Sequence, residues 1–413
     1  MTQNIFIFII LIVSLVSIVY SYERLRIVFH ILLIGWLFRL ALLLAQYYGF
    51  FAIPGGGADA AAFIRYAGFL TELPWPAMLE LFNPNHAFNG YAWYGALVMR
   101  VVGFHELIMP AMNLLAGTVG LIFAIRIVQE MWGWKAAKIA AWILALYPFA
   151  AFNSAIALRE EFAITAFVIG LYYLLKWARN QSVLGVFIAV VFFGIATTIH
   201  AGFVGAFVGL ALFMGVRAFR SIRVLIKGKS ITSREMLNTL GSLSGLVILV
   251  GIITVGGGLS IGKGITVGGE DGDDALVEAI ESRFQRDSQG GSAYPSVIAT
   301  GDPFAQPWLI PARMTYFHFS PFPWDIRSPR HLLGLVSALL YIFLFYRIYK
   351  GWPQLRKRPE HEVMLFMLLG LTFVFAVGVT NIGTAIRHKT KFLSLIVVMA
   401  ASSFSSLKSR IKI

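Results

Sequence analysis

Apolar residues occupy most of this chain in stretches of about 20, and short polar segments separate one stretch from the next. A helix needs about 20 predominantly apolar residues to cross a bilayer, so the pattern predicts about eleven membrane spans. They lie near residues 5–21, 27–49, 107–128, 136–156, 162–178, 182–199, 201–216, 238–260, 331–349, 362–380 and 392–407. The predicted fold is an all-α polytopic membrane protein, with residues 1–413 forming a single membrane-embedded helical domain.

The composition agrees with this pattern. Of 413 residues, 58% are hydrophobic and 13% are charged, and the mean hydropathy is +0.76. Soluble domains carry roughly 25% charged residues, so a soluble enzyme is excluded. The chain has no cysteine, which excludes disulfide bonds, thiolate zinc sites and iron–sulfur clusters. No Walker-type phosphate loop occurs, which argues against an ATP-driven pump.

The net charge is +14, from 34 basic and 20 acidic residues. In a polytopic protein Lys and Arg gather in cytoplasmic loops, so this charge predicts orientation and not a nucleic-acid partner. The basic clusters all fall on one side of the predicted spans: Arg24 and Arg26; Arg126, Lys135 and Lys138; Lys176 and Arg179; Arg217 to Lys229; Arg347 to Arg358; and Lys408, Arg410 and Lys412. We therefore expect a multi-pass membrane protein with the N-terminus outside and the C-terminus in the cytoplasm. The first stretch lacks a basic leader, so no cleaved signal peptide is expected.

Two long segments fall on the outer side, residues 50–106 and 261–330. In the first, the apolar stretch 91–104 has about 14 residues, too few for a span, and predicts an interfacial or re-entrant helix. The second holds nine of the twenty acidic residues, and its residues 274–286 have the spacing of an amphipathic helix. Prolines and aromatic residues follow, which predict an irregular loop packed at the membrane interface.

Several basic residues fall on the predicted outer side, where the orientation rule does not account for them. They are Arg159, Arg313, Arg327, Arg387, Lys389 and Lys391. One such residue can simply extend its charge to the membrane surface, whereas a cluster beside acidic and imidazole groups tends to mark a binding site. The segment 387–391 places three cations and His388 within five positions, which predicts a phosphate or pyrophosphate site.

Three further positions carry candidate chemistry. Asp59 follows Pro54 and three glycines where a helix can begin, so it is either an N-cap or a catalytic or metal-binding carboxylate. Arg159, Glu160 and Glu161 lie on a tight outer turn, where they are either solvated or present a fixed group to an anion. His200 lies at the junction of two spans and is either structural or a catalytic imidazole.

The order of these features resembles that of the GT-C type integral-membrane glycosyltransferases, which use polyprenyl-phosphate-linked sugars. The likeness is one of layout and covers about residues 25–215. Asp59 matches the acidic residue of their first outer loop, and the stretch 91–104 resembles an interfacial helix of that loop. The segments 109–115 and 145–148 are similar to the helix pair that precedes a Pro turn in these proteins. Arg159–Glu160 falls where such proteins often carry a charged pair. Many relatives carry a second acid beside the first, whereas here the next is Glu72. The segments 321–324 and 384–389 resemble parts of bacterial exopolysaccharide or capsule membrane proteins.

The resemblance implies transfer of a sugar from a polyprenyl-(pyro)phosphate carrier to a glycan, lipid or protein acceptor at the outer face, in cell-surface polysaccharide biosynthesis of the cell envelope. Under this hypothesis Asp59 is the base that deprotonates the acceptor, with His200 and Glu160 as further catalytic groups. Phosphate binding falls to Arg159, Arg387, His388, Lys389 and Lys391. Asp59 is also the expected position for a divalent cation, Mg or Mn.

Three other functions fit the same sequence. A polymerase or ligase of lipid-linked oligosaccharides would depend on Arg159 and Arg387 and tolerate the loss of Asp59. A transporter or flippase of lipid-linked anions is disfavoured, because no internal repeat is evident and Arg39 is nearly the only charge deep within a predicted span. A scaffold without catalytic activity would leave the outer charge cluster unexplained.

Overall fold

The computed structural model describes residues 2–54, 58–81, 87–180, 183–227, 259–262, 265–267, 292–299, 306–326 and 329–405. Within these ranges the protein is helical, apart from one short antiparallel hairpin of β1 (Leu259–Gly262) and β2 (Ile265–Val267). The helices pack into two compact units. Unit 1 comprises Met1–His200, Ile342–Lys357 and Thr390–Ile413, and unit 2 comprises Ala201–Tyr341 and Arg358–Lys389. Hydrophobic spacing predicts helices but not which helices pack together, so this division was not evident from the pattern.

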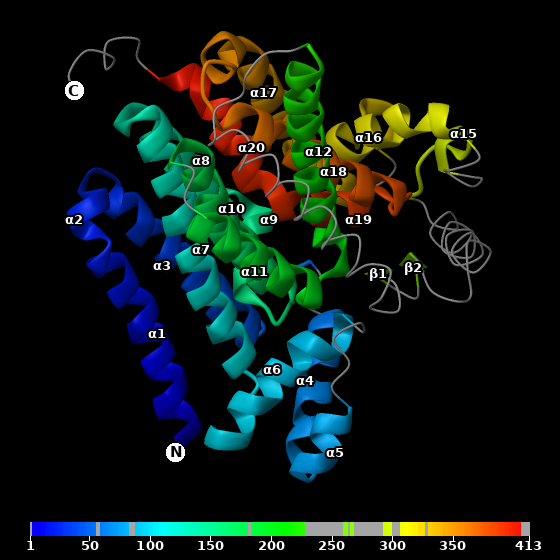
Figure 1. Ribbon diagram of the computed structural model, residues 1–413. Helices are drawn as coiled ribbons and strands as arrows, with labels where there is room; N and C mark the ends of the chain where they lie inside the picture. Colours follow the sequence, from blue (N-terminus) through cyan, green and yellow to red (C-terminus); the bar gives the residue numbers. More distant parts are fainter. Residues whose placement is uncertain are drawn as a thin grey trace. The chain divides into compact units, whose positions relative to one another are not determined.

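Unit 1 is built around α7 (Ile108–Trp132), which is buried along almost its whole length. It packs against α1 (Thr2–Tyr20), α8 (Trp134–Leu146), α9 (Pro148–Ala155) and α10 (Glu160–Asn180), as Figure 1 shows. Farther from α7, α3 (Phe29–Tyr47) lies against α8 and α9, α11 (Val183–Ile199) lies against α10, and α4 (Ala58–Glu72) lies against α6 (Ala87–Val102). The unit also contains α2 (Tyr22–Leu25), η1 (Arg26–Val28), α5 (Trp75–Glu80), η5 (Thr390–Phe392), α20 (Leu393–Ala400) and η6 (Ala401–Phe404).

In unit 2 the long helix α12 (Val204–Ile226) packs against α18 (His361–Val377), which in turn contacts α16 (Ile310–Phe319). The shorter elements of this unit are η2 (Ala201–Phe203), α15 (Ser296–Ala299), η3 (Pro307–Leu309), η4 (Pro323–Asp325) and α19 (Ile382–Lys389). Helix α17 (Pro329–Leu355) begins in unit 2 and ends in unit 1.

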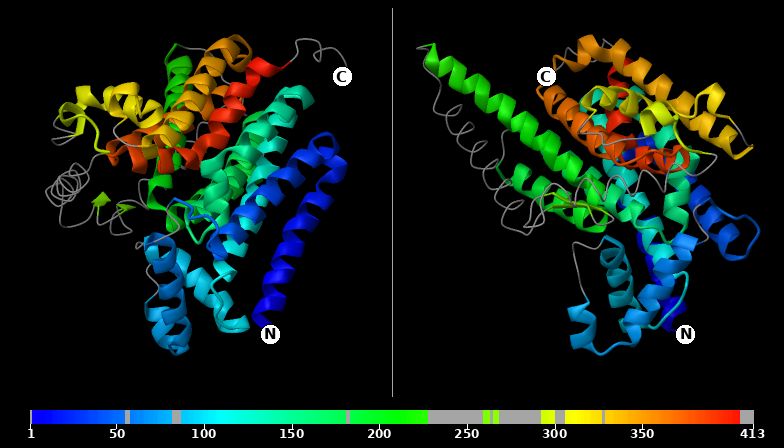
Figure 2. Two further views of the ribbon diagram at one scale, coloured as in Figure 1. Left: turned by 180° about the vertical axis from the view of Figure 1, so that it is seen from behind. Right: turned by 90° about the vertical axis from the view of Figure 1, so that its right-hand side faces the viewer.

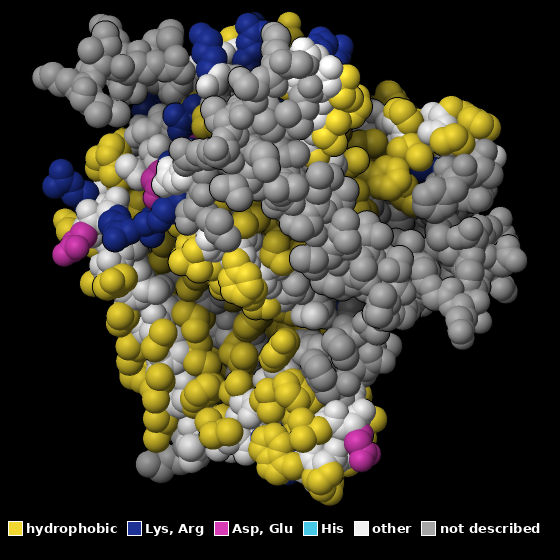
Figure 3. All heavy atoms as spheres, viewed as in Figure 1, with side chains coloured by type: hydrophobic (Ala, Val, Ile, Leu, Met, Phe, Trp, Pro, Cys, Tyr) yellow, Lys and Arg dark blue, Asp and Glu magenta, His cyan; other side chains and the backbone are white. Residues whose placement is uncertain are grey.

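Six helices among the described residues are long and apolar enough to cross a membrane, or seven if a bent pair counts as one span. They are Thr2–Tyr20, Tyr22–Tyr47, Ile108–Trp132, Glu160–Asn180, Ala201–Val224 and Leu332–Leu355, and the bent pair is α8 with α9. The apolar side chains of α1 are largely exposed, with Phe8 at 63% and Val16 at 54%. Figure 3 shows hydrophobic side chains along α1, with charged ones near α2. Such a surface fits lipid, so the protein is a multi-pass membrane protein.

The prediction of about eleven spans is therefore too high for the described residues. The predicted spans 182–199 and 362–380 form α11 and α18, which have 17 residues each and lie at the lower limit of a spanning helix. The predicted span 392–407 is wrong as a continuous helix, because η5, the eight-residue α20 and η6 occupy this segment. Seven of the eight α20 residues are buried in the protein, and a buried core segment is as apolar as one that faces lipid. The predicted span 238–260 lies almost wholly outside the described residues.

The outer segments also differ from the prediction. The stretch 91–104 lies within helix α6 for most of its length, as expected of a short helix, and its place at the membrane interface stays a prediction. The proline-rich stretch after residue 295 was expected to be irregular, but it contains the ten-residue helix α16. Pro311 does not prevent this helix because it occupies the first turn, where a helix needs no N–H. The amphipathic helix predicted at 274–286 and Arg327 lie outside the described residues.

A bend of 56° between α8 and α9 breaks the predicted span 136–156. Pro148 opens α9 and has no N–H, so the carbonyl of Leu144 loses its helical partner. Arg39 of α3 supplies donors instead: its guanidinium lies 3.0 Å from Leu144 O and 2.7 Å from Ala145 O. The arginine is 3% exposed and satisfies backbone groups that the proline leaves unbonded.

Candidate functional site

Three ionisable side chains from distant segments meet inside unit 1. Lys391 Nζ lies 2.7 Å from His200 Nε2 and 3.6 Å from Glu160 Oε1. The three residues are almost fully buried, at 0% exposed for Lys391 and Glu160 and 6% for His200. Buried charges are costly unless they are paired, so this cluster must be held together by its own interactions. The sequence predicted all three residues as site residues, and the structure brings them together.

Each member of the cluster stands at the end of a helical element. Glu160 opens α10, where the partial positive charge of the helix N-terminus favours a carboxylate. His200 follows α11, and Lys391 lies in η5. These three ends meet because α11 packs along α10 while η5 also contacts α10.

The geometry fixes the proton arrangement of His200. A charged lysine has donors and no acceptor, so Lys391 donates to His200 Nε2 and the imidazole proton sits on Nδ1. Lys391 balances the Glu160 carboxylate at the same time.

A second buried pair lies beside this cluster. Glu161 follows Glu160 in α10 and is 6% exposed, and it interacts electrostatically with Arg39 and by a hydrogen bond with Ser154. Arg39 Nε also donates to Ser154 Oγ at 3.2 Å. A Cβ at Gly117 would lie 2.6 Å from Glu161 Oε1, so the glycine gives the carboxylate room against α7. The contacts among Arg39, Ser154 and Glu161 therefore connect the break between α8 and α9 with the start of α10.

The turn before Glu160 is held by Asn113 of α7. Its Nδ2 donates to the carbonyls of Ile156 and Leu158, at 2.5 and 2.8 Å, and its Oδ1 accepts a hydrogen bond from Tyr91 Oη at 3.1 Å. Burial raises the pKa of Tyr91 well above its usual value, and the nearby carboxylates of Glu160 and Glu161 raise it further. Tyr91 therefore stays protonated and keeps donating to Asn113.

Asp59 and Arg159 stand near the starts of two helices of unit 1, α4 and α10. Arg159, directly before Glu160, is half-buried, and its guanidinium carbon lies 6.0 Å from the centre of the Phe63 ring. Asp59 is exposed in the first turn of α4, four residues before Phe63, so the two side chains share one face of that helix. Phe63 also packs edge-on against Tyr91. Phe63 thus lies one helical turn from Asp59 on α4 and 6.0 Å from the Arg159 guanidinium carbon.

The other predicted phosphate ligands belong to unit 2. Lys389 is fully buried, and its ammonium donates to the carbonyls of His318 and Ser320, at 3.0 and 3.1 Å, and lies 4.9 Å from the centre of the Tyr341 ring. These carbonyls end α16, so the lysine caps that helix and does not present its charge to a phosphate in this arrangement. Burial lowers the pKa of Lys389 to about 7.

His318 lies in the same buried group, with Nε2 2.9 Å from Thr372 Oγ1. Burial, and to a lesser extent the charge of Lys389, lowers the pKa of His318 to about 3. The imidazole is therefore neutral at neutral pH. His388 and Arg387 of α19 are half-buried, and the His388 ring meets Phe375 edge-on at 5.2 Å. Arg313, one of the basic residues on the predicted outer side, is fully buried in α16.

Sequence reasoning missed several residues that position the cluster: Arg39, Asn113, Tyr91 and Ser154. A single asparagine or tyrosine in an apolar run carries no functional signature, so only the fold identifies Asn113 and Tyr91. Arg39 did carry a signal, because a charge deep in a predicted span is expensive and needs a partner. The partner is the proline-broken pair of helices.

No three His, Asp or Glu side chains come close enough to hold a metal ion in the part of the chain that the structure describes. The described surroundings of Asp59 thus do not supply a set of carboxylate or imidazole ligands for Mg or Mn.

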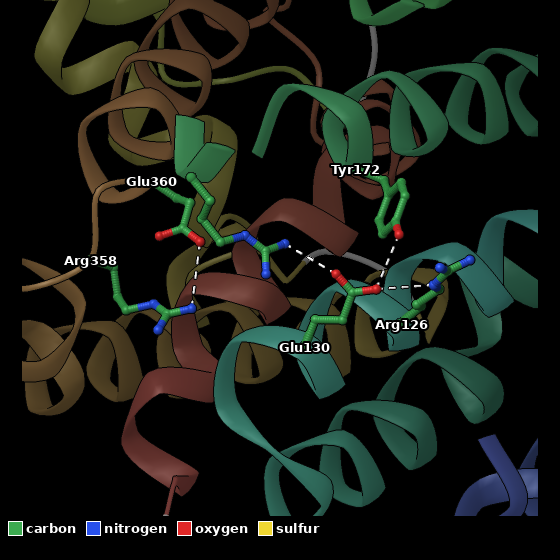
Figure 4. A network of polar contacts seen from close by, with 6 residues as sticks. Arg126, Glu130, Tyr172, Arg358 and Glu360 are labelled. Atoms are coloured by element: carbon green, nitrogen blue, oxygen red, sulfur yellow. Dashed lines mark hydrogen bonds and ion pairs between the residues drawn. The ribbon is translucent and has the colours of Figure 1, made fainter. Parts of the chain in front are cut away.

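A further polar network connects α7 and α10 (Figure 4). Glu130 accepts hydrogen bonds from Arg126 at 3.0 Å, Arg179 at 3.1 Å and Tyr172 at 3.1 Å, and all four side chains belong to these two helices. Two cations and a hydroxyl share one partly buried carboxylate, which is a structural crosslink between neighbouring helices. In unit 2, Arg358 pairs with Glu360 at 3.5 Å in the same figure.

No protein-family model and no curated protein matches this chain. Among solved structures it is similar to two of the oligosaccharyltransferase from the archaeon Archaeoglobus fulgidus, one in complex with an inhibitory peptide and a dolichol-phosphate and one in the apo form. The identities are 14% and 15% and the TM-score is 0.49 in both cases. The matches cover 92% and 93% of this chain and 50% and 51% of the other chains, so this chain spans about half their length.

Proposed function

We propose that this protein transfers a sugar from a polyprenyl-(pyro)phosphate carrier to a glycan, lipid or protein acceptor at the outer face of the bacterial plasma membrane, in the biosynthesis of cell-surface polysaccharide. The observation that carries the proposal is the buried cluster of Glu160, His200 and Lys391, in which Glu160 directly follows Arg159 in the sequence. Such a cluster is expensive inside a membrane protein and tends to mark a site.

The proposed reaction divides its work among these residues. The acceptor hydroxyl oxygen forms a bond to the anomeric carbon of the sugar, while the bond from that carbon to the phosphate oxygen breaks. Asp59, exposed on α4, takes the hydroxyl proton. Negative charge collects on the departing phosphate, and the guanidinium of Arg159 stabilises it. Glu160 directly follows Arg159, and its ion pair with Lys391 holds the start of α10 in place. His200, whose Nε2 lies 2.7 Å from Lys391 Nζ, shares proton transfer in this proposal.

A divalent cation at Asp59 remains part of the proposal, but no step of this mechanism depends on it. If a metal assists, a chelator removes activity and Mg²⁺ or Mn²⁺ restores it. If activity survives chelation, the metal is not required. Arg387 and His388 remain candidates for phosphate binding, whereas the buried Lys389 is assigned to the structure of unit 2.

The test uses the full-length protein in proteoliposomes with a labelled polyprenyl-pyrophosphate sugar and an added acceptor. Asp59→Asn should lower kcat by about 10²- to 10⁴-fold, the usual range for a general base. Arg159→Gln should lower it by about 10²- to 10³-fold, the usual cost of one donor to a developing anion. Glu72→Gln is the matched control, because it removes the same charge from the far end of α4 and should keep full activity.

Other outcomes distinguish the alternatives. Full activity in Asp59→Asn with loss in Arg159→Gln would favour the polymerase or ligase, in which cations dominate. Movement of the lipid-linked sugar across the vesicle membrane without any glycosidic product would favour a transporter and exclude the proposed transfer.

A further inference from the structure

The C-terminal end of α12 carries a stripe of basic side chains. Arg217, Arg220, Arg223 and Lys227 follow one another at intervals of three or four residues, which places them along one side of the helix. Figure 2 shows α12 as a long green helix. Arg220, Arg223 and Lys227 are exposed, and Arg217 is half-buried.

Among the described residues of unit 2, one carboxylate faces the stripe. Arg220 pairs with Glu362 of α18 at 2.6 Å, yet its side chain is still 61% exposed. Glu362 also attracts Arg217, so one carboxylate serves two arginines. Among the described residues, no carboxylate is paired with Arg223 or Lys227. Counting only the described residues, four cations and one carboxylate leave a net charge of +3 at this helix end.

Large apolar side chains occupy the adjoining side of the same helix end. Phe219 is 66% exposed, Ile222 is 40% exposed and Ile226 is 80% exposed. The candidate span ends at Val224, so the stripe straddles the point where the helix leaves the hydrocarbon layer. At the end of a span, the basic side of the helix can bind a lipid headgroup while the adjoining apolar side contacts the acyl chains of the same lipid.

We propose that this α12 stripe, defined as Arg217, Arg220, Arg223 and Lys227, binds the headgroup of an anionic phospholipid. The cations hold the lipid phosphate, and Phe219, Ile222 and Ile226 contact its acyl chains. Charge complementarity between the stripe and the lipid phosphate supports this site, which does not depend on the proposed transferase activity.

A comparison within the protein shows that not every basic helix end forms such a stripe. Arg126 and Arg179 are partly buried, and both pair with Glu130. Lys135 and Lys138 are exposed on α8 but are only two in number. These last two residues provide a control with the same loss of charge as the replacement of Arg223 and Lys227.

The experiment measures thermal unfolding of the full-length protein in a neutral detergent while phosphatidylglycerol or phosphatidylcholine is added. Phosphatidylglycerol should raise the Tm of the wild type, and phosphatidylcholine should not. Arg223→Gln with Lys227→Gln should keep the Tm of the lipid-free protein, because neither side chain pairs with a described carboxylate. It should weaken the apparent affinity for phosphatidylglycerol about tenfold or more, since each basic residue near an anionic surface contributes about 1 kcal/mol. The Lys135→Gln with Lys138→Gln variant should respond like the wild type.

Native mass spectrometry of the same samples should show phosphatidylglycerol bound to the wild type and reduced in the first variant. Three results would overturn the proposal. The first is an unchanged Tm in the wild type on lipid addition. The second is an equal loss of affinity in both double variants, which would mean a general charge effect. The third is equal stabilisation by inorganic phosphate, which would indicate a site for free anions and not for lipid.

Discussion

At the residue scale, the protein keeps two groups of charged side chains out of contact with solvent, and they are stabilised in different ways. In unit 1 Lys391 faces a carboxylate and an imidazole, so its charge is compensated. In unit 2 Lys389 faces carbonyl oxygens and a tyrosine ring, and burial alone lowers its pKa. The sequence places Lys389 and Lys391 two positions apart and predicts phosphate binding for both, whereas the structure gives the two lysines different surroundings.

The ion pair of Lys391 and Glu160 should contribute strongly to the free energy of unfolding, and this contribution should be lost when one partner is removed. Lys391→Met should lower the free energy of unfolding by about 3 to 5 kcal/mol, because it leaves the Glu160 carboxylate buried without its cation. The double variant Glu160→Gln with Lys391→Met should recover most of that loss. Denaturant unfolding in detergent measures both, and a double variant no more stable than Lys391→Met would contradict the pairing.

The lowered pKa of Lys389 predicts a pH dependence of stability. The folded value is about 7 and the ordinary value of the unfolded chain is 10.5. Between these values the unfolded chain binds more protons than the folded protein, so the free energy of unfolding should rise with pH, by up to about 1.4 kcal/mol per pH unit.

Lys389→Met should remove this rise, which thermal unfolding of wild type and variant between pH 7 and pH 10 can measure. The shifted pKa of His318 affects stability between about pH 3 and pH 6.5, because its pKa is about 3 in the folded protein and ordinarily 6.5. This pH range does not overlap with the range from pH 7 to pH 10 in which Lys389 acts. An identical slope in wild type and variant would mean that Lys389 is not the group responsible.

At the element scale, close backbone packing joins α12 and α18 in unit 2. A Cβ added at Gly209 would collide with the carbonyl oxygen of Phe366 and would lie 2.8 Å from the Cα of Met367. A Cβ at Gly370 would meet the backbone of Gly205 and Gly209. Small residues four apart on one helix allow this approach, a common way for helices to associate inside a membrane.

Gly209→Leu should therefore separate α12 from α18 and lower the Tm strongly, because backbone atoms cannot move aside as a side chain can. Gly215→Ala on the same helix is the control: nothing lies within 4 Å of its added Cβ, and the better helix propensity of alanine should leave the Tm unchanged or slightly raised. Equal tolerance of both substitutions in a thermal unfolding assay would contradict the close packing.

At the scale of the whole molecule, orientation in the membrane decides which residues can meet an external substrate. The charge pattern predicts an outer N-terminus and a cytoplasmic C-terminus. Alkaline phosphatase fused at the N-terminus should be active, because this reporter works only on the outer side. Green fluorescent protein fused at the C-terminus should fluoresce, because this reporter works only in the cytoplasm. The opposite pair of results would place Asp59 and Arg159 on the cytoplasmic side and exclude the proposed outer-face reaction.

The sequence alone predicted a helical multi-pass membrane protein, because a run of about 20 apolar residues has few other ways to satisfy its backbone in lipid. It also singled out Glu160, His200 and Lys391, since ionisable groups next to spans are rare. It could not predict that 392–407 is broken and buried, because apolar sequence does not distinguish lipid from protein interior. Only the tertiary structure showed that Lys391 pairs with Glu160 while Lys389 caps a helix, and that Arg39 and Asn113 hold the surrounding turns. These roles depend on contacts between residues far apart in the chain, and local sequence patterns carry no information about such contacts.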